Sequence, residues 1–315
     1  MVLVLDEVQK ISNWADEVKR LWDEDTRFGK NIKVVILGSS ALLLKKGLNE
    51  SLAGRFEIIQ MSHWTWKECK ECFNWTFDEY VYFGGYPGAA SLISDEQRWA
   101  AYIRDALIET AVSKDILLLN RVEKPVLLRQ LFVLACEYGG QILSYQKLLG
   151  QLSDAGNTTT LAHYQKLFEL AFLIKGLPKW TGSVVRRRNS SPKWIPLNTA
   201  LMTALVNLDF KSWREKPDFW GRLIEVSVGA YLINEGNKYG IDVYYWRKGN
   251  YEVDFIMKKG NILIAIEVKS GKKRSVFSGL KKFSEEYPHA KTIIIGDEGI
   301  KIENFLESPI LSWFN

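Results

Sequence analysis

Apolar and polar residues alternate along two neighbouring segments near the C-terminus, Tyr251 to Met257 and Asn261 to Ser270. Alternation with a period of two is typical of β-strands, and Lys259-Gly260 between the segments predicts a two-residue hairpin turn. This turn would set Asp254 opposite Ala265. One face of the hairpin is apolar and is expected to be core; it comprises Val253, Phe255, Met257, Ile262, Ile264, Ile266 and Val268.

Helical and extended patterns surround this hairpin in a definite order. A helix is predicted from about Asp218 to Asn234, and a strand from Asp242 to Trp246. After the hairpin, the sequence predicts a helix from Ser278 to Tyr287 and a strand from Lys291 to Ile295. The last third of the chain is therefore expected to form a mixed α/β domain with the order α-β-β-β-α-β.

The second face of the hairpin carries Asp254, Glu267 and Lys269. Asp254 and Glu267 would be diagonal cross-strand neighbours with Cβ atoms about 7 Å apart or less, close enough for both carboxylates to hold one ion. Carboxylate oxygens suit Mg²⁺ or Mn²⁺, which would polarise a phosphate and help to deprotonate an attacking water. Lys269 would orient that water or offset the charge that develops on the phosphate.

This arrangement resembles the PD-(D/E)XK nuclease superfamily, with Asp254 as the first acid and Glu267-Val268-Lys269 as the E-x-K motif. The resemblance implies a metal-dependent endodeoxyribonuclease with Asp254, Glu267 and Lys269 as catalytic residues. It also implies that Asp254 and Glu267 bind Mg²⁺ or Mn²⁺, and that DNA is the partner.

In many members of that superfamily the first helix supplies another acid. Glu225 matches it, because it is the only ionisable residue between Arg222 and Glu235. A carboxylate on an apolar stretch needs a partner, and an alternative is that Glu225 pairs with an arginine while Glu267 and Lys269 form an exposed, salt-bridged edge. Many proteins with this core bind without cutting, so a non-catalytic module that binds nucleic acid or protein is the alternative function.

The N-terminal segment Val2-Leu3-Val4-Leu5 is a short apolar run that ends in Asp6-Glu7, the form of a buried parallel strand with acids at its C-terminal end. It resembles a Walker B motif. The resemblance implies that Asp6 holds Mg²⁺ and that Glu7 activates water. The alternative is an acid pair at the N-terminus of a helix, followed by the amphipathic segment Ile11 to Trp22.

A second apolar run, Ile32 to Leu37, leads into Gly38-Ser39-Ser40 and resembles the sensor-1 strand of AAA-type ATPases. In that resemblance Ser39 contacts the γ-phosphate, and Arg55, in Ser51-Leu52-Ala53-Gly54-Arg55, reads the nucleotide within one subunit or across a subunit boundary.

The sequence has no G-x-x-x-x-G-K-[ST] motif, the loop that cradles phosphates in P-loop ATPases. The order of the Walker B, sensor-1 and Gly-Arg segments, followed by residues 82–87, resembles prokaryotic AAA-type ATPases with a C-terminal domain of unknown function. In that family a complete ATPase core, which binds ATP, precedes a winged helix and a PD-(D/E)XK-like domain. ATP binding by this chain is not expected, and we expect a truncated reading frame rather than a remnant that lost hydrolysis.

The region between these two ends has a helical pattern. Helices are predicted over Pro125 to Tyr138, over Ser144 to Leu152 and through Leu170, followed by extended segments at Leu173 to Trp180 and Lys193 to Leu197. This order predicts a winged helix whose wing holds Arg186, Arg187 and Arg188, either touching DNA phosphates or simply solvated. The expected domains are 1–75, a partial AAA-type core; 76–212, helical and winged-helix; and 213–315, nuclease-like.

Composition fits an ordinary globular protein. The chain has 315 residues, of which 47% are hydrophobic and 25% charged, with a net charge of +5 that mildly favours anionic partners. Its three cysteines form no even set and, with no signal peptide or membrane span in the sequence, predict a cytoplasmic protein. DNA is the expected partner, assembly of several copies is a further expectation, and no membrane partner is expected.

Overall fold

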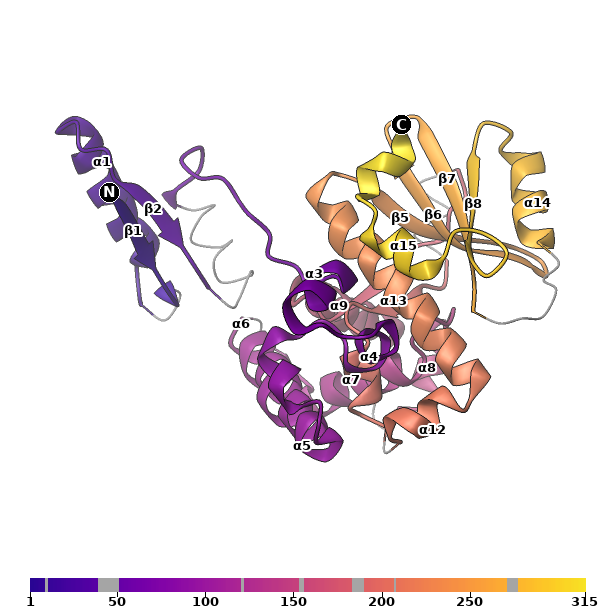
Figure 1. The fold of residues 1–315 in the computed structure, drawn as a ribbon. Helices are drawn as coiled ribbons and strands as arrows, with labels where there is room; N and C mark the ends of the chain where they lie inside the picture. Colours follow the sequence, from indigo (N-terminus) through magenta and orange to yellow (C-terminus); the bar gives the residue numbers. More distant parts are fainter. Residues whose placement is uncertain are drawn as a thin grey trace. The chain divides into compact units, whose positions relative to one another are not determined.

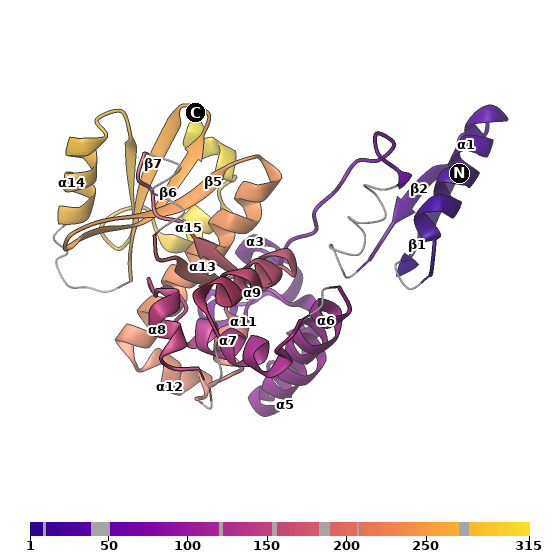
Figure 2. The same cartoon turned by 180° about the vertical axis from the view of Figure 1, so that it is seen from behind.

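The computed structural model describes residues 1–8, 11–38, 51–119, 122–152, 156–182, 190–206, 208–270 and 277–315. These residues divide into two compact units, the first formed by Met1–Met61 with Lys114–Arg121 and the second by Ser62–Ser113 with Val122–Asn315. Figure 1 labels the helices and strands of both units, and Figure 2 shows the same elements from behind. Within the described residues, none of the helices is long and apolar enough to cross a membrane.

The first unit contains two short parallel strands. Strand β1 (Val2–Leu5) pairs with β2 (Lys33–Ile36), and helix α1 (Trp14–Arg27) lies between them in the chain. The prediction of a buried strand is wrong for the described residues, since Val2 is 60% and Val4 55% exposed. A parallel strand is buried when strands flank it and helices cover both faces of the sheet. The described part of this unit supplies β1 with one neighbouring strand.

The second unit begins with short helices that have well-formed N-termini. Helices α3 (Trp66–Phe73) and α4 (Phe77–Phe83) both begin with a capping box, in which Thr65 or Thr76 exchanges hydrogen bonds with the glutamate three residues later. The chain continues through η2 (Pro87–Leu92), α5 (Glu96–Ala101), η3 (Tyr102–Ile108) and η4 (Ala111–Asp115). The last two residues of η4 and all of α6 (Ile116–Leu119) belong to the first unit.

The middle of the chain forms three helices and then two antiparallel strands, as the sequence predicted. They are α7 (Pro125–Glu137), α8 (Tyr145–Leu149), α9 (Thr158–Leu170), β3 (Ile174–Leu177) and β4 (Lys193–Pro196). Ile142, between α7 and α8, also forms a bridge with Lys193 on β4. The predicted wing, with Arg186, Arg187 and Arg188, lies outside the described residues.

The C-terminal part confirms the predicted α-β-β-β-α-β order. After α11 (Ala200–Thr203) and α12 (Phe210–Arg214) come α13 (Pro217–Lys238), β5 (Asp242–Lys248), β6 (Tyr251–Lys259), β7 (Ile262–Lys269), α14 (Ser278–Glu286), β8 (Lys291–Gly296), α15 (Ile302–Glu307) and η5 (Ile310–Phe314). The four strands lie side by side in chain order, antiparallel from β5 to β7 and parallel between β7 and β8.

The predicted register of the β6–β7 hairpin is wrong by two residues. Lys259 pairs with Ile262, so the turn is Gly260-Asn261, and Ala265 lies opposite Ile256 rather than Asp254. Gly260 has φ 56°, and a two-residue turn with positive φ at its first central position takes glycine there. A register shift of two residues does not by itself change the face of any side chain. It does bring the Asp254 end of β6 level with Glu267 on β7.

Strand β6 contains a bulge that the alternating pattern does not show. Tyr244 pairs with Ile256 and Trp246 with Val253, so two residues of β6, Asp254 and Phe255, lie across from a single residue of β5. An inserted residue reverses the alternation of side chains beyond it. Val253 was predicted to share a face with Phe255, but it packs in a cluster with Ile256 instead.

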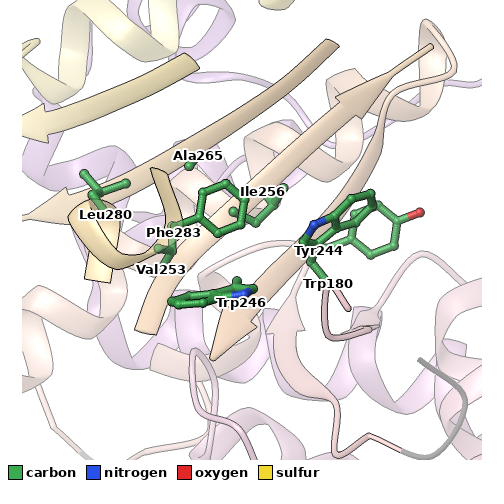
Figure 3. Close-up of a cluster of buried hydrophobic side chains, with 8 residues drawn as sticks. All are labelled: Trp180, Tyr244, Trp246, Val253, Ile256, Ala265, Leu280 and Phe283. Atoms are coloured by element: carbon green, nitrogen blue, oxygen red, sulfur yellow. The ribbon is translucent and has the colours of Figure 1, made fainter. Parts of the chain in front are cut away.

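Both faces of the sheet are buried, whereas the sequence predicted a single core face. Helix α13 covers one face so closely that a Cβ on Gly229 would lie 2.8 Å from the ring of Phe255. Helix α14 lies on the other side of the sheet (Figures 1 and 2). The cluster beneath α14, drawn in Figure 3, consists of Trp180, Tyr244, Trp246, Val253, Ile256, Ala265, Leu280 and Phe283.

Candidate functional site

One buried ammonium group lies among three carboxylates from two other elements. The Nζ atom of Lys193, at the start of β4, lies 2.6 Å from Glu225 Oε1 on α13. It lies 3.5 Å from Asp254 Oδ1 and 3.6 Å from Glu252 Oε1, both on β6. The side chain of Lys193 is only 1% exposed, whereas those of Glu225, Asp254 and Glu252 are 24%, 15% and 37% exposed. We refer to these four residues as the Lys193 cluster.

The β-bulge explains how Asp254 reaches this cluster. Phe255, the other residue of the bulge, packs against α13, and its ring centroid lies 5.0 Å from Lys193 Nζ. Bulges redirect side chains in this way, often beside functional sites. Without the extra residue, strict alternation would direct Asp254 away from the face on which Phe255 packs against α13.

Lys193 keeps its positive charge in this setting. Burial acts against the charged form, but the attraction of Glu225, Asp254 and Glu252 is stronger, and together they raise the pKa of the Lys193 ammonium above its ordinary value. The pKa of the Glu225 carboxyl is also raised, because the effect of its burial exceeds the attraction of Lys193. The cluster therefore holds a permanent internal cation.

Glu267 and Lys269, on β7, form a second ion pair beside the cluster. Lys269 Nζ lies 2.7 Å from Glu267 Oε1, and the N–H of Val268 donates to Asp254 Oδ2 at 2.8 Å. Burial, and then the charge of Asp254, raise the pKa of Glu267 to about 7, although Lys269 opposes the shift. Glu267 Oε2 is buried and accepts no hydrogen bond from the described residues.

The structure thus brings the predicted C-terminal residues into two adjoining groups. Glu225 and Asp254 contact Lys193, and Glu267 contacts Lys269. The alternative that Glu225 pairs with a basic residue is confirmed, but the partner is Lys193 and not an arginine. Glu267 and Lys269 do form a salt bridge, but Glu267 is buried rather than on an exposed edge. The catalytic roles of all four residues stay predictions.

Sequence reasoning missed Lys193. Its one local signal is a charged residue beside the apolar pair Trp194-Ile195 in a predicted strand, since a charge in such a run is expected to have a partner. The partners themselves lie 32 to 61 residues further along the chain.

The residues do not fit the divalent cation that the nuclease resemblance implies. The Lys193 ammonium lies 2.6 to 3.6 Å from the carboxylates of Glu225, Asp254 and Glu252, so the position that a divalent cation would need is already taken by a positive group. Within the part of the chain that the structure describes, no group of three or more His, Cys, Asp and Glu side chains is arranged to hold a metal ion. Lys193 occupies the centre of the acids instead.

Three of the residues predicted for a nucleotide site, Asp6, Glu7 and Arg55, lie in the described part of the first unit. Asp6 is exposed just after β1, and Glu7 has φ 54° and donates its N–H to Leu37 O at 3.0 Å. Ser39 lies outside the described residues.

Arg55, which the sequence predicts to contact a nucleotide, instead contacts two side chains of helix α1. Its guanidinium lies 3.5 Å from Asp23 Oδ1 and 5.4 Å from the ring centroid of Trp22. The roles of Asp6 in binding Mg²⁺, and of Glu7, Ser39 and Arg55 in binding ATP, stay predictions.

Three family models match successive parts of the chain. The model described as an AAA domain matches residues 1–70, and two described as domains of unknown function, DUF8612 and DUF4143, match residues 74–212 and 220–311. The first 70 residues are similar to an AAA domain. This confirms the predicted resemblance to AAA-type proteins that carry a C-terminal domain of unknown function, while the resemblance to nucleases stays a prediction.

The similar curated proteins include three whose names describe them as uncharacterized. The Mycobacterium tuberculosis protein is 24% identical over 299 residues, which cover 93% of this chain and 64% of the relative. The Haemophilus influenzae protein is 23% identical over 277 residues, 84% of this chain and 64% of the relative. The Methanocaldococcus jannaschii protein is 23% identical over 325 residues, 95% of this chain and 69% of the relative. No solved structure matches the chain.

This chain therefore spans 64% of the length of the mycobacterial and Haemophilus relatives.

Proposed function

We propose that this chain is part of an AAA-type ATPase whose nuclease-like C-terminal domain binds a macromolecular partner without cutting it. The observation that carries the proposal is the Lys193 ammonium among Glu225, Glu252 and Asp254. In the nuclease resemblance Asp254 holds the metal together with Glu267, and Glu225 is the further acid; here an ammonium of the chain itself lies against Asp254 and Glu225.

Nucleic acid, DNA in particular, is the partner that the architecture favours. The support is an analogy of fold: a helical region with a winged-helix order lies beside an α-β-β-β-α-β domain, and both architectures serve nucleic-acid proteins. Lys269, 34% exposed, is the member of the two ion groups best placed to meet a phosphate from solvent. Several copies of the chain assembling together, and a cytoplasmic location, complete the proposal.

Metal-dependent DNA cleavage is the second candidate. It is favoured by Glu267 Oε2, a buried carboxylate oxygen with no hydrogen-bond donor among the described residues. Asp254 and Lys269 lie close to Glu267, as the E-x-K resemblance requires.

A plasmid-nicking assay with Mn²⁺, paired with DNA binding measured by fluorescence anisotropy, separates the two candidates. The binding proposal predicts no nicking above that of buffer. It also predicts salt-sensitive DNA binding that weakens about threefold or more in Lys269→Ala, as expected for loss of a phosphate contact. Lys175→Ala is the matched control, because Lys175 also pairs with a glutamate, at 2.8 Å, and is 36% exposed.

Nicking that disappears in both Asp254→Ala and Lys269→Ala would establish cleavage instead. DNA binding that is absent, or equally reduced by Lys175→Ala, would remove nucleic acid as the partner of this site.

A further inference from the structure

We infer that the Lys193 ammonium takes the place of a divalent cation in the C-terminal acidic site, so that the middle region of the chain keeps this site free of metal. The inference deepens the proposed non-cutting function and rests on it. It concerns metal binding itself, which is measured without DNA.

The surroundings of Lys193 Nζ are those of a cation-binding site. Carboxylate oxygens of Glu225, Asp254 and Glu252 lie within 3.6 Å, and the main-chain oxygen of Asp254 lies at 3.4 Å. Hard oxygen donors from several elements are the ligands that Mg²⁺ and Mn²⁺ prefer. An ammonium is itself a compact point charge that three such oxygens can surround.

A metal ion cannot enter this position unless Lys193 leaves it. The lysine is 1% exposed, and the residues on both sides of it are held, since Leu143 N–H donates to Pro192 O at 3.1 Å and Trp194 N–H donates to Gln141 O at 3.0 Å. Trp194 O accepts from Gly140 N–H at 2.7 Å, and its indole Nε1 donates to Leu143 O at 3.0 Å. The backbone of β4 is therefore fixed, and the ammonium can leave its position only by rotation of the Lys193 side chain away from Glu225, Asp254 and Glu252.

The cation and the acids come from different parts of the chain. Lys193 lies in the segment that matches one family model, residues 74–212, whereas Glu225, Glu252 and Asp254 lie in the segment that matches another, residues 220–311. The internal cation of the C-terminal acidic site thus comes from the middle region, and removal of its amino group should open the site to a metal ion.

Mn²⁺ binding to the full chain, followed by isothermal titration calorimetry and by the electron paramagnetic resonance signal of free Mn²⁺, tests the inference. The unmodified protein should show no stoichiometric site. Lys193→Met keeps the volume and removes the charge. This variant should bind one Mn²⁺ per chain, with an affinity at least about tenfold higher than any weak binding by the unmodified protein. Adding Glu225→Gln to that variant should abolish the gain, and the control Lys175→Met should behave like the unmodified protein.

Two results would overturn the inference. One is a single Mn²⁺ site in the unmodified protein that is lost on Glu225→Gln, and the other is a folded Lys193→Met variant whose affinity is unchanged. If Lys193→Met does not fold, NMR line broadening by Mn²⁺ in the unmodified protein decides the question. Broadening of the amide signals of Glu225 and Asp254 at about one equivalent would contradict the inference, and its absence would support it. Failure of DNA binding would leave either metal result intact, so the two proposals fail separately.

Discussion

A lysine that is almost wholly buried stays charged only while its partners remain. Lys193 loses hydration on folding and recovers that free energy from Glu225, Asp254 and Glu252. Removing one member of such a group leaves the others buried and uncompensated, which costs more than the group contributes as a whole. Substitution of Lys193 alone should therefore cost more free energy of unfolding than substitution of Lys193 together with one of its acidic partners.

Lys193→Met should lower the free energy of unfolding by about 3 kcal/mol or more, because the carboxylates of Glu225 and Asp254 lose their counter-ion. Urea denaturation at neutral pH measures this loss. Adding Glu225→Gln should restore part of the stability, since one of the uncompensated charges is removed. Losses that simply add in the double variant would show that the two residues are not coupled.

Glu267 should make stability depend on pH. Its folded pKa, about 7, is above the ordinary 4.5, so the folded protein holds an extra proton between these values. The free energy of unfolding should therefore fall as pH rises from about 4.5 to 7, by about 1 kcal/mol per pH unit at most. The difference between the unmodified protein and Glu267→Gln, measured by denaturation across this range, isolates the effect. A flat difference would contradict the shift.

Among the elements, helix α14 depends on a close approach to β6. A Cβ on Gly279 would lie 2.9 Å from the carbonyl carbon of Glu252 and closer still to its oxygen. Gly279→Ala should therefore lower the free energy of unfolding by about 2 kcal/mol, since backbone cannot give way as a flexible side chain does. Gly150→Ala is the control, because the nearest atom to its Cβ is 3.6 Å away. Equal effects of the two substitutions in thermal denaturation would refute this account.

The order of the elements could be predicted from the sequence, but their exact pairing could not. Alternation around Phe255 and Ile264 identifies the strands and survives a register error of two residues. The bulge at Asp254 leaves no mark on the pattern, because the residues of a bulge are of ordinary strand type. Lys193 was missed for a related reason: its partners are set by tertiary contacts across many residues, and local patterns carry no information about such contacts.

At the scale of the whole molecule, the two units differ in how well they are packed. The second unit buries both faces of its sheet, whereas β1 of the first is largely exposed among the described residues. The acids Asp6 and Glu7 follow that strand, and the sequence has no phosphate-binding loop to accompany them.

Addition of Mg²⁺ and ATP should therefore shift the melting temperature of this chain by less than about 1 °C, since a ligand stabilises only the state it binds. Differential scanning fluorimetry with millimolar ATP measures the shift, and ADP provides a comparison. A shift of several degrees that is lost in Asp6→Ala would show that another segment replaces the missing loop.

The contact between α3 and α15 has a consequence for how the protein is made. Glu307 accepts from Trp66 Nε1 at 3.0 Å and from Lys70 Nζ at 2.7 Å, across some 240 residues of chain. Synthesis proceeds from the N-terminus. Helix α3 therefore leaves the ribosome long before α15, and its contact with Glu307 can form only when nearly the entire second unit has been made. During that interval the indole N–H of Trp66 has no Glu307 carboxylate to donate to, whereas its ring contacts with Phe77 and Tyr80 can already form.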